Sequence, residues 1–268
     1  MTLLNIYEIS WPNLGLGYLL LIIPFTLLHL FRTGLVKDTL VAVARMTVQL
    51  FLVGLYLEFL FNINNPWVNI AWVLLMIAVA SYATVSRSQL KSRIFFIPVA
   101  LSILLSMIII DAFFMGLIIQ AGSFLEARYF IPITGMIIGN CMERNIIALN
   151  SFRGQVYREM DTYRYFVANG ASRHEALLPF IRTALKNAFN PLIANMAVIG
   201  LIALPGTMTG QILGGSSPNQ AIRYQILLLL GIFVATMITV VVSIMLSRRF
   251  LFDEMDNLKE EHIISTKH

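Results

Sequence analysis

Two groups of side chains in this sequence could bind a metal cation. The first is Asp111, an acid deep inside an apolar run with no nearby basic residue. Such an acid can line a cation path, or it can be protonated and hydrogen-bonded. The second is the run Asn140, Cys141, Met142 and Glu143, which combines the oxygen donors that hard cations prefer with the sulfur donors that soft cations prefer. In the alternative reading, Glu143 pairs with a neighbouring basic residue and the methionine only fills space.

Polar residues also share one side of an early apolar stretch. Gln49 and Tyr56 follow Arg45 by four and eleven residues, and this spacing places all three on one face of an α-helix. Polar groups in hydrocarbon tend to face a cavity or a partner helix, so Gln49 joins the candidate substrate path. Arg45 can instead extend its side chain to the inner membrane surface.

No enzyme motif accompanies these residues. The sequence contains no phosphate-binding loop, no zinc-protease motif and no nucleophile elbow. The four histidines lack the spacing of metal ligands. The sequence therefore predicts a protein without catalytic residues and without a bound cofactor, and it leaves any metal unidentified.

The composition predicts an integral membrane protein. The chain of 268 residues is 58% hydrophobic and 12% charged, against roughly 45–50% and about 25% in soluble domains. Its net charge of +5 comes from basic residues near the ends of apolar runs, which indicates the lipid bilayer rather than nucleic acid as partner. One cysteine excludes an internal disulfide.

Apolar runs of about 20 residues match the hydrocarbon thickness of a bilayer. We expect an all-α integral membrane protein with about seven transmembrane helices, forming one domain over residues 1–268. The predicted spans cover residues 14–31, 39–61, 67–86, 94–119, 129–149, 188–204 and 224–247. A polar tail follows at residues 250–268.

The distribution of positive charge predicts the orientation. With the N-terminus outside, all of the 19 Lys and Arg residues except Arg128 and Arg223 lie on the inner side. Because inner loops carry the excess of Lys and Arg, we predict N-out, C-in topology in the cell membrane.

The long polar stretch at residues 150–187, hereafter the coupling segment, has the pattern of a docking element. Gly170 is a natural stop for one helix, and Ser172 with Glu175 can cap the next. Ala171 completes the turn between them. This cytoplasmic helix-turn-helix element predicts contact with a soluble partner, although it can also be an ordinary amphipathic surface loop.

Glycines recur every four residues before the last predicted span, at Gly206, Gly210 and Gly214. On a helix they form a stripe that permits close approach of another backbone. Residues 204–213 are too short to cross a bilayer, so we expect a helical extension of the sixth span or a re-entrant element. Together with Gln211, the stripe is a candidate gate at a subunit interface, and an ordinary outer loop is the alternative.

Several motifs resemble one transporter family. The run Gly170–Ala171–Ser172, followed by Glu175–Ala176 and Leu178–Pro179, is similar to the coupling loop of ABC transporter permeases. The usual Glu-Ala-Ala at its front is replaced by residues 165–168. With the Pro-Gly to Gly-Gly stretch at residues 205–215, and with residues 45–50, 135–140 and 221–225, nearly the whole chain resembles FetB-type permeases.

The resemblance implies a permease that forms a homodimer and works with a separate ATP-binding subunit, which holds ATP and Mg²⁺. It also implies iron export, with plant relatives linked to aluminium tolerance. A non-ABC membrane transporter is an alternative. So is a seven-span receptor, although the span at 224–247 lacks the lysine that retinal requires. An intramembrane enzyme would need a second acid near Asp111.

Overall fold

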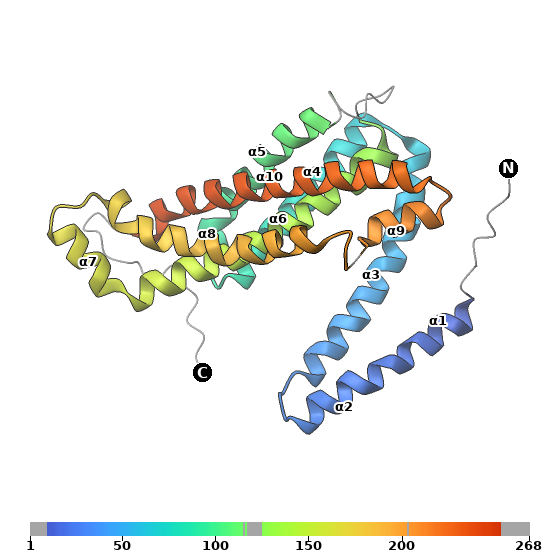
Figure 1. Ribbon diagram of the computed structural model, residues 1–268, viewed down its shortest axis with the longest axis horizontal. Coiled ribbons are helices and arrows are strands. Elements are labelled where there is room, and N and C mark those ends of the chain that lie inside the picture. The colour runs from blue at the N-terminus through green and yellow to red at the C-terminus, as the bar shows by residue number, and fades with distance from the viewer. Residues whose placement is uncertain (1–9, 115, 117–124, 203, 253–268) are drawn as a thin grey trace.

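The computed structural model describes residues 10–114, 116, 125–202 and 204–252. In these residues the chain folds into helices joined by short turns (Figure 1). The N-terminal helices are α1 (Trp11–Tyr18), α2 (Ile22–Leu30), α3 (Val36–Ile63) and α4 (Pro66–Arg87), and a 3₁₀ turn (Leu19–Leu21) makes α1 and α2 one continuous rod. The remaining helices are α5 (Ser92–Phe113), α6 (Ala127–Arg158), α7 (Met160–Ala168), α8 (Arg173–Val198), α9 (Gly206–Leu213) and α10 (Pro218–Leu251).

Five helices of the described chain are long and apolar enough to cross a membrane. They are the α1–α2 rod and helices α3, α4, α5 and α10. They match the predicted spans at 14–31, 39–61, 67–86, 94–119 and 224–247, although residues 115 and 117–119 of the fourth span lie outside the described part. The protein is thus all-helical with five candidate spans, and a total of seven remains a prediction.

The other two predicted spans lie in helices that combine apolar and polar parts. Helix α6 contains residues 129–149 and continues for nine more residues to Arg158. Helix α8 runs from Arg173 to Val198, so it contains residues 188–198 of the predicted sixth span, and the span itself stays a prediction. The helix starts fifteen residues earlier, and it ends before the left-handed Gly200 (φ 85°).

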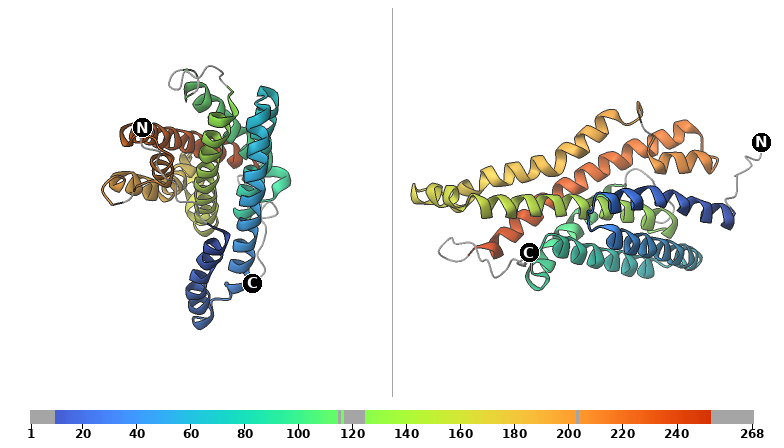
Figure 2. Two further views of the ribbon diagram at one scale, coloured as in Figure 1. Left: turned by 90° about the vertical axis from the view of Figure 1, so that its right-hand side faces the viewer. Right: turned by 90° about the horizontal axis from the view of Figure 1, so that it is seen from below.

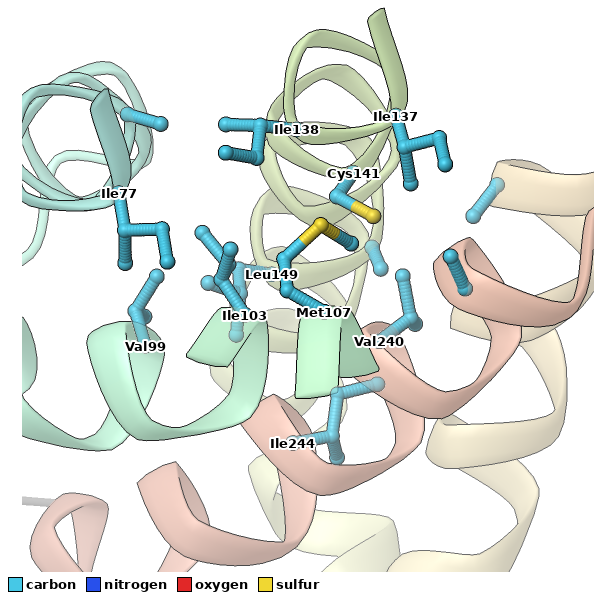
Figure 3. Packing of buried hydrophobic residues seen from close by; sticks show 14 of the residues in the cluster. Ile77, Val99, Ile103, Met107, Ile137, Ile138, Cys141, Leu149, Val240 and Ile244 are labelled. Atoms are coloured by element: carbon cyan, nitrogen blue, oxygen red, sulfur yellow. The ribbon is translucent and has the colours of Figure 1, made fainter. Parts of the chain in front are cut away.

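The core lies where α4, α5, α6 and α10 pack side by side (Figures 1 and 2). Figure 3 shows branched aliphatic side chains from all four helices meeting around Met107 and Cys141. Gly135 of α6 allows close approach of α4, because a Cβ atom there would lie 2.7 Å from Met76 Cε. This glycine therefore lets the Met76 side chain pack directly against the α6 backbone.

Asparagines fasten the α3–α4 turn to the start of α6. Asn64 adopts a left-handed conformation (φ 41°), and its side-chain oxygen accepts a hydrogen bond from the Ala127 N–H at 2.9 Å. Asn65 caps α4 through the Trp67 N–H, and Asn69 donates to the Leu125 carbonyl at 2.8 Å. The α3–α4 turn and the start of α4 thus also hold the start of α6 in place.

Candidate functional site

The turn between α7 and α8 has the geometry expected from its sequence. Gly170 is left-handed (φ 87°), its N–H bonds to the Val167 carbonyl at 3.0 Å, and the Ala171 N–H bonds to the Phe166 carbonyl at 3.0 Å. This pair of bonds is the Schellman motif, which satisfies the last carbonyls of a helix. The prediction that Gly170 ends one helix is confirmed.

The start of α8 carries the predicted capping box. Ser172 Oγ accepts a hydrogen bond from the Glu175 N–H at 3.3 Å, and Glu175 Oε2 accepts one from the Ser172 N–H at 2.8 Å. The side-chain and backbone hydrogen bonds from Ser172 lower the pKa of the exposed Glu175 carboxyl. Gly170, Ser172 and Glu175 therefore fix the angle between the two helices.

The coupling segment is fastened to the nearby ends of other helices. Arg153 donates to Gln89 Oε1 in the α4–α5 turn at 2.7 Å. His174 Nδ1 lies 2.8 Å from the Arg248 guanidinium near the end of α10. The buried ring of Tyr163 packs against Phe252 with a centroid separation of 5.1 Å. A force on this segment would therefore reach α5 and α10 directly.

Helix α8 itself also connects the α7–α8 turn to the helix bundle. It begins at the capped turn, packs on α6 and ends 26 residues later (Figure 1). At about 1.5 Å per residue it measures about 39 Å, which exceeds the hydrocarbon thickness. The predicted docking turn thus leads directly into the helix that contains most of the predicted sixth span.

Asp111 lies buried between α5 and α6. Its side chain accepts a hydrogen bond from Thr134 Oγ1 at 3.1 Å, and no ion pair reaches it among the described residues. The residue also borders an apolar cavity of about 270 Å³ between α4 and α5. This arrangement fits both readings of Asp111, a hydrogen-bonded acid and a cation ligand.

The four residues from Asn140 to Glu143 do not converge on one point. Asn140 donates to the Met136 carbonyl of its own helix at 2.9 Å, and Cys141 is fully buried. Glu143 is exposed and forms an ion pair with Arg144 at 2.9 Å. Successive helical residues point about 100° apart, so these four side chains do not surround a common point. A place for Asn140 and Glu143 on the substrate path stays a prediction. Within the described chain, no three His, Cys, Asp or Glu side chains gather around a possible ion.

A buried row of hydroxyl groups joins α5 to α10, and the sequence reasoning missed it. Ser102 Oγ lies 2.5 Å from Ser243 Oγ, and Ser106 Oγ lies 2.7 Å from Thr239 Oγ1. We call these four residues the hydroxyl seam. Their spacing of four residues within each helix was the available signal, because it puts each pair on one face.

Helix α9 is separate from α8 and lies against α10 (Figure 1). The expectation of a helical extension of the sixth span is therefore wrong, because the chain turns after Val198 and restarts its helix at Gly206. Thr207 donates a hydrogen bond to Gln225 of α10. A Cβ atom at Gly206 or Gly210 would meet nothing within 4 Å. A Cβ atom at Gly214 would meet only carbonyl oxygens of α9 itself, so no other element packs on the stripe within the described chain. Gln211 is half-buried beside it.

The predicted face of α3 divides into two parts. Tyr56 packs on Trp72 of α4 with a ring-centroid separation of 4.2 Å, whereas Arg45 and Gln49 are exposed. The described part of the chain therefore does not bring Gln49 and Asp111 together. Gln49 is exposed on α3, and Asp111 is buried between α5 and α6.

Comparison with known proteins identifies relatives over most of the chain. The chain is 29% identical to the UPF0014 membrane protein YjkA of Bacillus subtilis, over 94% of this chain and 99% of the relative. It is 33% identical to the protein ALUMINUM SENSITIVE 3 of Arabidopsis thaliana, over 72% of this chain and 69% of the relative. The probable iron export permease protein FetB of Escherichia coli is 26% identical, over 95% of this chain and 97% of the relative.

No solved structure matches the chain. The model of the uncharacterised protein family UPF0014 matches residues 11–252. This range includes the coupling segment, Asp111, the hydroxyl seam and all five candidate spans. The chain is therefore a multi-pass membrane protein that belongs to the UPF0014 family.

Proposed function

We propose that this chain is the membrane-spanning subunit of an ABC transporter that exports iron, or a related metal or metal-linked solute, using ATP hydrolysed by a separate subunit. The observation that carries the proposal is helix α8. It connects a rigid, capped cytoplasmic turn to the helical bundle without a break. The relative named as a probable iron export permease, which aligns with 95% of this chain, supports the substrate class.

The mechanism follows from the connections of the coupling segment. The ATP-binding subunit docks on the α7–α8 turn, and nucleotide binding displaces the turn. Because Ser172 and Glu175 hold the start of α8, and because Arg248 and Phe252 join the segment to α10, both helices move together. Such a coupled movement alternates access between the two sides of the membrane.

The exported species would pass Asp111. A carboxylate in hydrocarbon is costly unless it meets a cation, a proton or a polar cavity, and Thr134 supplies a single hydroxyl partner. A passing metal cation can supply the missing positive charge. In this proposal Glu143 has a smaller role, since Arg144 already neutralises it.

The test replaces the left-handed glycine of the docking turn, and the control replaces a left-handed glycine elsewhere. The wild-type chain, reconstituted with its ATP-binding subunit, should stimulate ATP hydrolysis and export iron from loaded vesicles. Gly170→Val places a β-branched residue at φ 87°, a conformation that such residues resist. We expect it to reduce both activities by at least tenfold.

Gly215→Val is the control, because Gly215 ends α9 with a similar φ of 93° on the predicted outer side. It carries comparable strain, and the chain should still retain the ATP-binding subunit. If Gly170→Val combined with Glu175→Arg keeps full ATPase stimulation, the docking site lies elsewhere. If the wild-type chain never stimulates an ATP-binding protein, the ABC assignment fails.

A further inference from the structure

The α1–α3 hairpin, residues 11–63, ends in a turn that lies far from the other helices. Residues 31–35 join the α1–α2 rod to α3, and Figure 1 shows this turn pointing away from the helix bundle. Both arms of the hairpin are long and apolar enough to cross a membrane. A hairpin that crosses twice therefore brings this turn out at a membrane surface, and the predicted topology makes it the cytoplasmic one.

A cavity of about 820 Å³ opens between the two arms at this turn. Its polar part is formed by His29, Arg32 and Lys37. Its apolar part is formed by Leu28, Val36 and Leu40. Asp38 follows Lys37 in the sequence but does not line the cavity. The cavity thus combines two fixed positive charges with an apolar wall.

The two charges have no protein partner in the described chain. Arg32 and Lys37 are exposed, and neither side chain, nor that of His29, forms a hydrogen bond or ion pair with another described residue. Arg and Lys bind phosphate oxygens through charge-assisted hydrogen bonds. Basic pockets beside membrane helices bind anionic lipid headgroups. The chemistry of the cavity therefore suits a phosphate group.

The apolar wall favours a phospholipid over a free phosphate ion. A small ion held by Arg32 and Lys37 would leave Leu28, Val36 and Leu40 against water. A lipid covers them with its glycerol and its first acyl carbons, and this burial is favourable. Helices α1 and α2 contain no buried residue, so acyl chains can continue along the rod.

We propose that the cavity at the α2–α3 turn binds the headgroup of an anionic phospholipid. Its phosphate contacts Arg32 and Lys37, and a ring N–H of His29 donates a further hydrogen bond. The bound lipid fixes the end of the hairpin at the membrane surface. This site is separate from the coupling segment, and the proposal does not rest on the permease assignment.

The experiment measures lipid binding to the full chain in detergent by native mass spectrometry. Phosphatidylglycerol and phosphatidylcholine with identical acyl chains are added separately, and we expect the wild-type chain to prefer phosphatidylglycerol. Arg32→Gln combined with Lys37→Gln should lower the affinity for phosphatidylglycerol about tenfold to thirtyfold, the effect of losing two basic side chains near anionic lipid. Binding of phosphatidylcholine should not change.

Arg182→Gln combined with Lys186→Gln is the matched control. It removes the same two types of charge from exposed side chains of α8, outside the cavity. Because distant charges are screened by salt, we expect the affinity for phosphatidylglycerol to change by less than about twofold. Equal losses in the two double variants would mean that lipid responds only to the net charge of the chain, and would overturn the proposal.

A second measurement locates the site on the unmodified chain. Phosphatidylglycerol with a photoreactive diazirine near its glycerol should label peptides within residues 28–40 more than peptides of α8. Labelling spread evenly over the exposed helices would overturn the proposal, as would equal wild-type affinity for the two lipids. Displacement of the lipid by millimolar inorganic phosphate would show that the cavity takes a free anion instead. These measurements need no ATP-binding subunit, so their failure and that of the proposed function are distinguishable.

Discussion

At the scale of single residues, the polar side chains separate into those with a structural partner and those without. Ser172 and Glu175 satisfy each other at the start of α8, and Glu143 is neutralised by Arg144. Asp111 has one hydroxyl partner, and Gln49 has no hydrogen-bond partner in the described chain. The least satisfied groups are the best candidates for contact with a substrate or another subunit.

Replacing Asp111 should affect transport more than stability. Asp111→Asn keeps the side-chain shape and removes the charge, so we expect normal membrane abundance and a clear loss of metal efflux. Glu143→Gln should reduce efflux less, because Glu143 is exposed and paired. Efflux of radioactive iron at equal abundance checks both, and full activity of Asp111→Asn would make this acid purely structural.

The capping box should respond to acid in a defined direction. Hydrogen bonds from Ser172 lower the pKa of Glu175, so their stabilising effect is present above the ordinary carboxyl pKa and is lost as pH falls through the lower folded-state pKa. A ¹³C NMR titration of labelled Glu175 should give a pKa below the ordinary range. Ser172→Ala should raise it, and an unchanged titration would contradict the observed hydrogen bonds.

At the scale of helices, two glycines in helical segments have opposite surroundings. A Cβ atom at Gly231 in α10 would lie 2.6 Å from the Phe114 ring, whereas one at Gly210 in α9 would meet nothing. Gly231 therefore permits close packing of α10, and Gly210 leaves an open surface.

Replacing each glycine with alanine should change the stability of the protein differently at the two positions. Gly231→Ala should destabilise the protein by about 1–3 kcal/mol through overpacking. Gly210→Ala should be neutral or stabilising by up to about 1 kcal/mol, because alanine favours helix. Thermal unfolding in detergent measures both, and equal melting temperatures would show that Phe114 moves aside freely.

A bulkier change at Gly210 tests the predicted gate. Gly210→Leu should leave the folding of one chain intact, because Gly210 is exposed and a Cβ atom there would meet nothing within 4 Å. It should nevertheless reduce transport or subunit association if another backbone lies against the stripe. Wild-type efflux with an unchanged oligomer would favour an ordinary outer loop.

At the scale of the whole molecule, the predicted N-out, C-in topology determines which end of each helix faces the cytoplasm. With the native Cys141 buried, a single introduced cysteine is the main reactive thiol. Ser10→Cys should react with an impermeant reagent from outside intact cells. Tyr165→Cys, on an exposed side chain (66%) of α7, should react only after permeabilisation; labelling of both from one side would exclude the N-out arrangement.

Local features of this fold could be predicted from the sequence, and non-local ones could not. The Schellman turn at Gly170 and the capping box at Ser172 depend on residues at most five positions apart. The hydroxyl seam pairs Ser102 with Ser243, which are 141 positions apart. The relative alignment of α5 and α10 that brings them together cannot be read from one sequence. The extent of α8 was also missed, because the polar stretch at residues 150–187 suggested a boundary near residue 188, whereas the helical hydrogen-bond pattern of the backbone continues through it.

The limited contact of the α1–α3 hairpin with its own chain has a consequence for biogenesis. The hairpin is synthesised before the helices that follow it, yet those helices bury almost none of it. The later helices can therefore complete their bundle in the bilayer without waiting for the hairpin to find a fixed position.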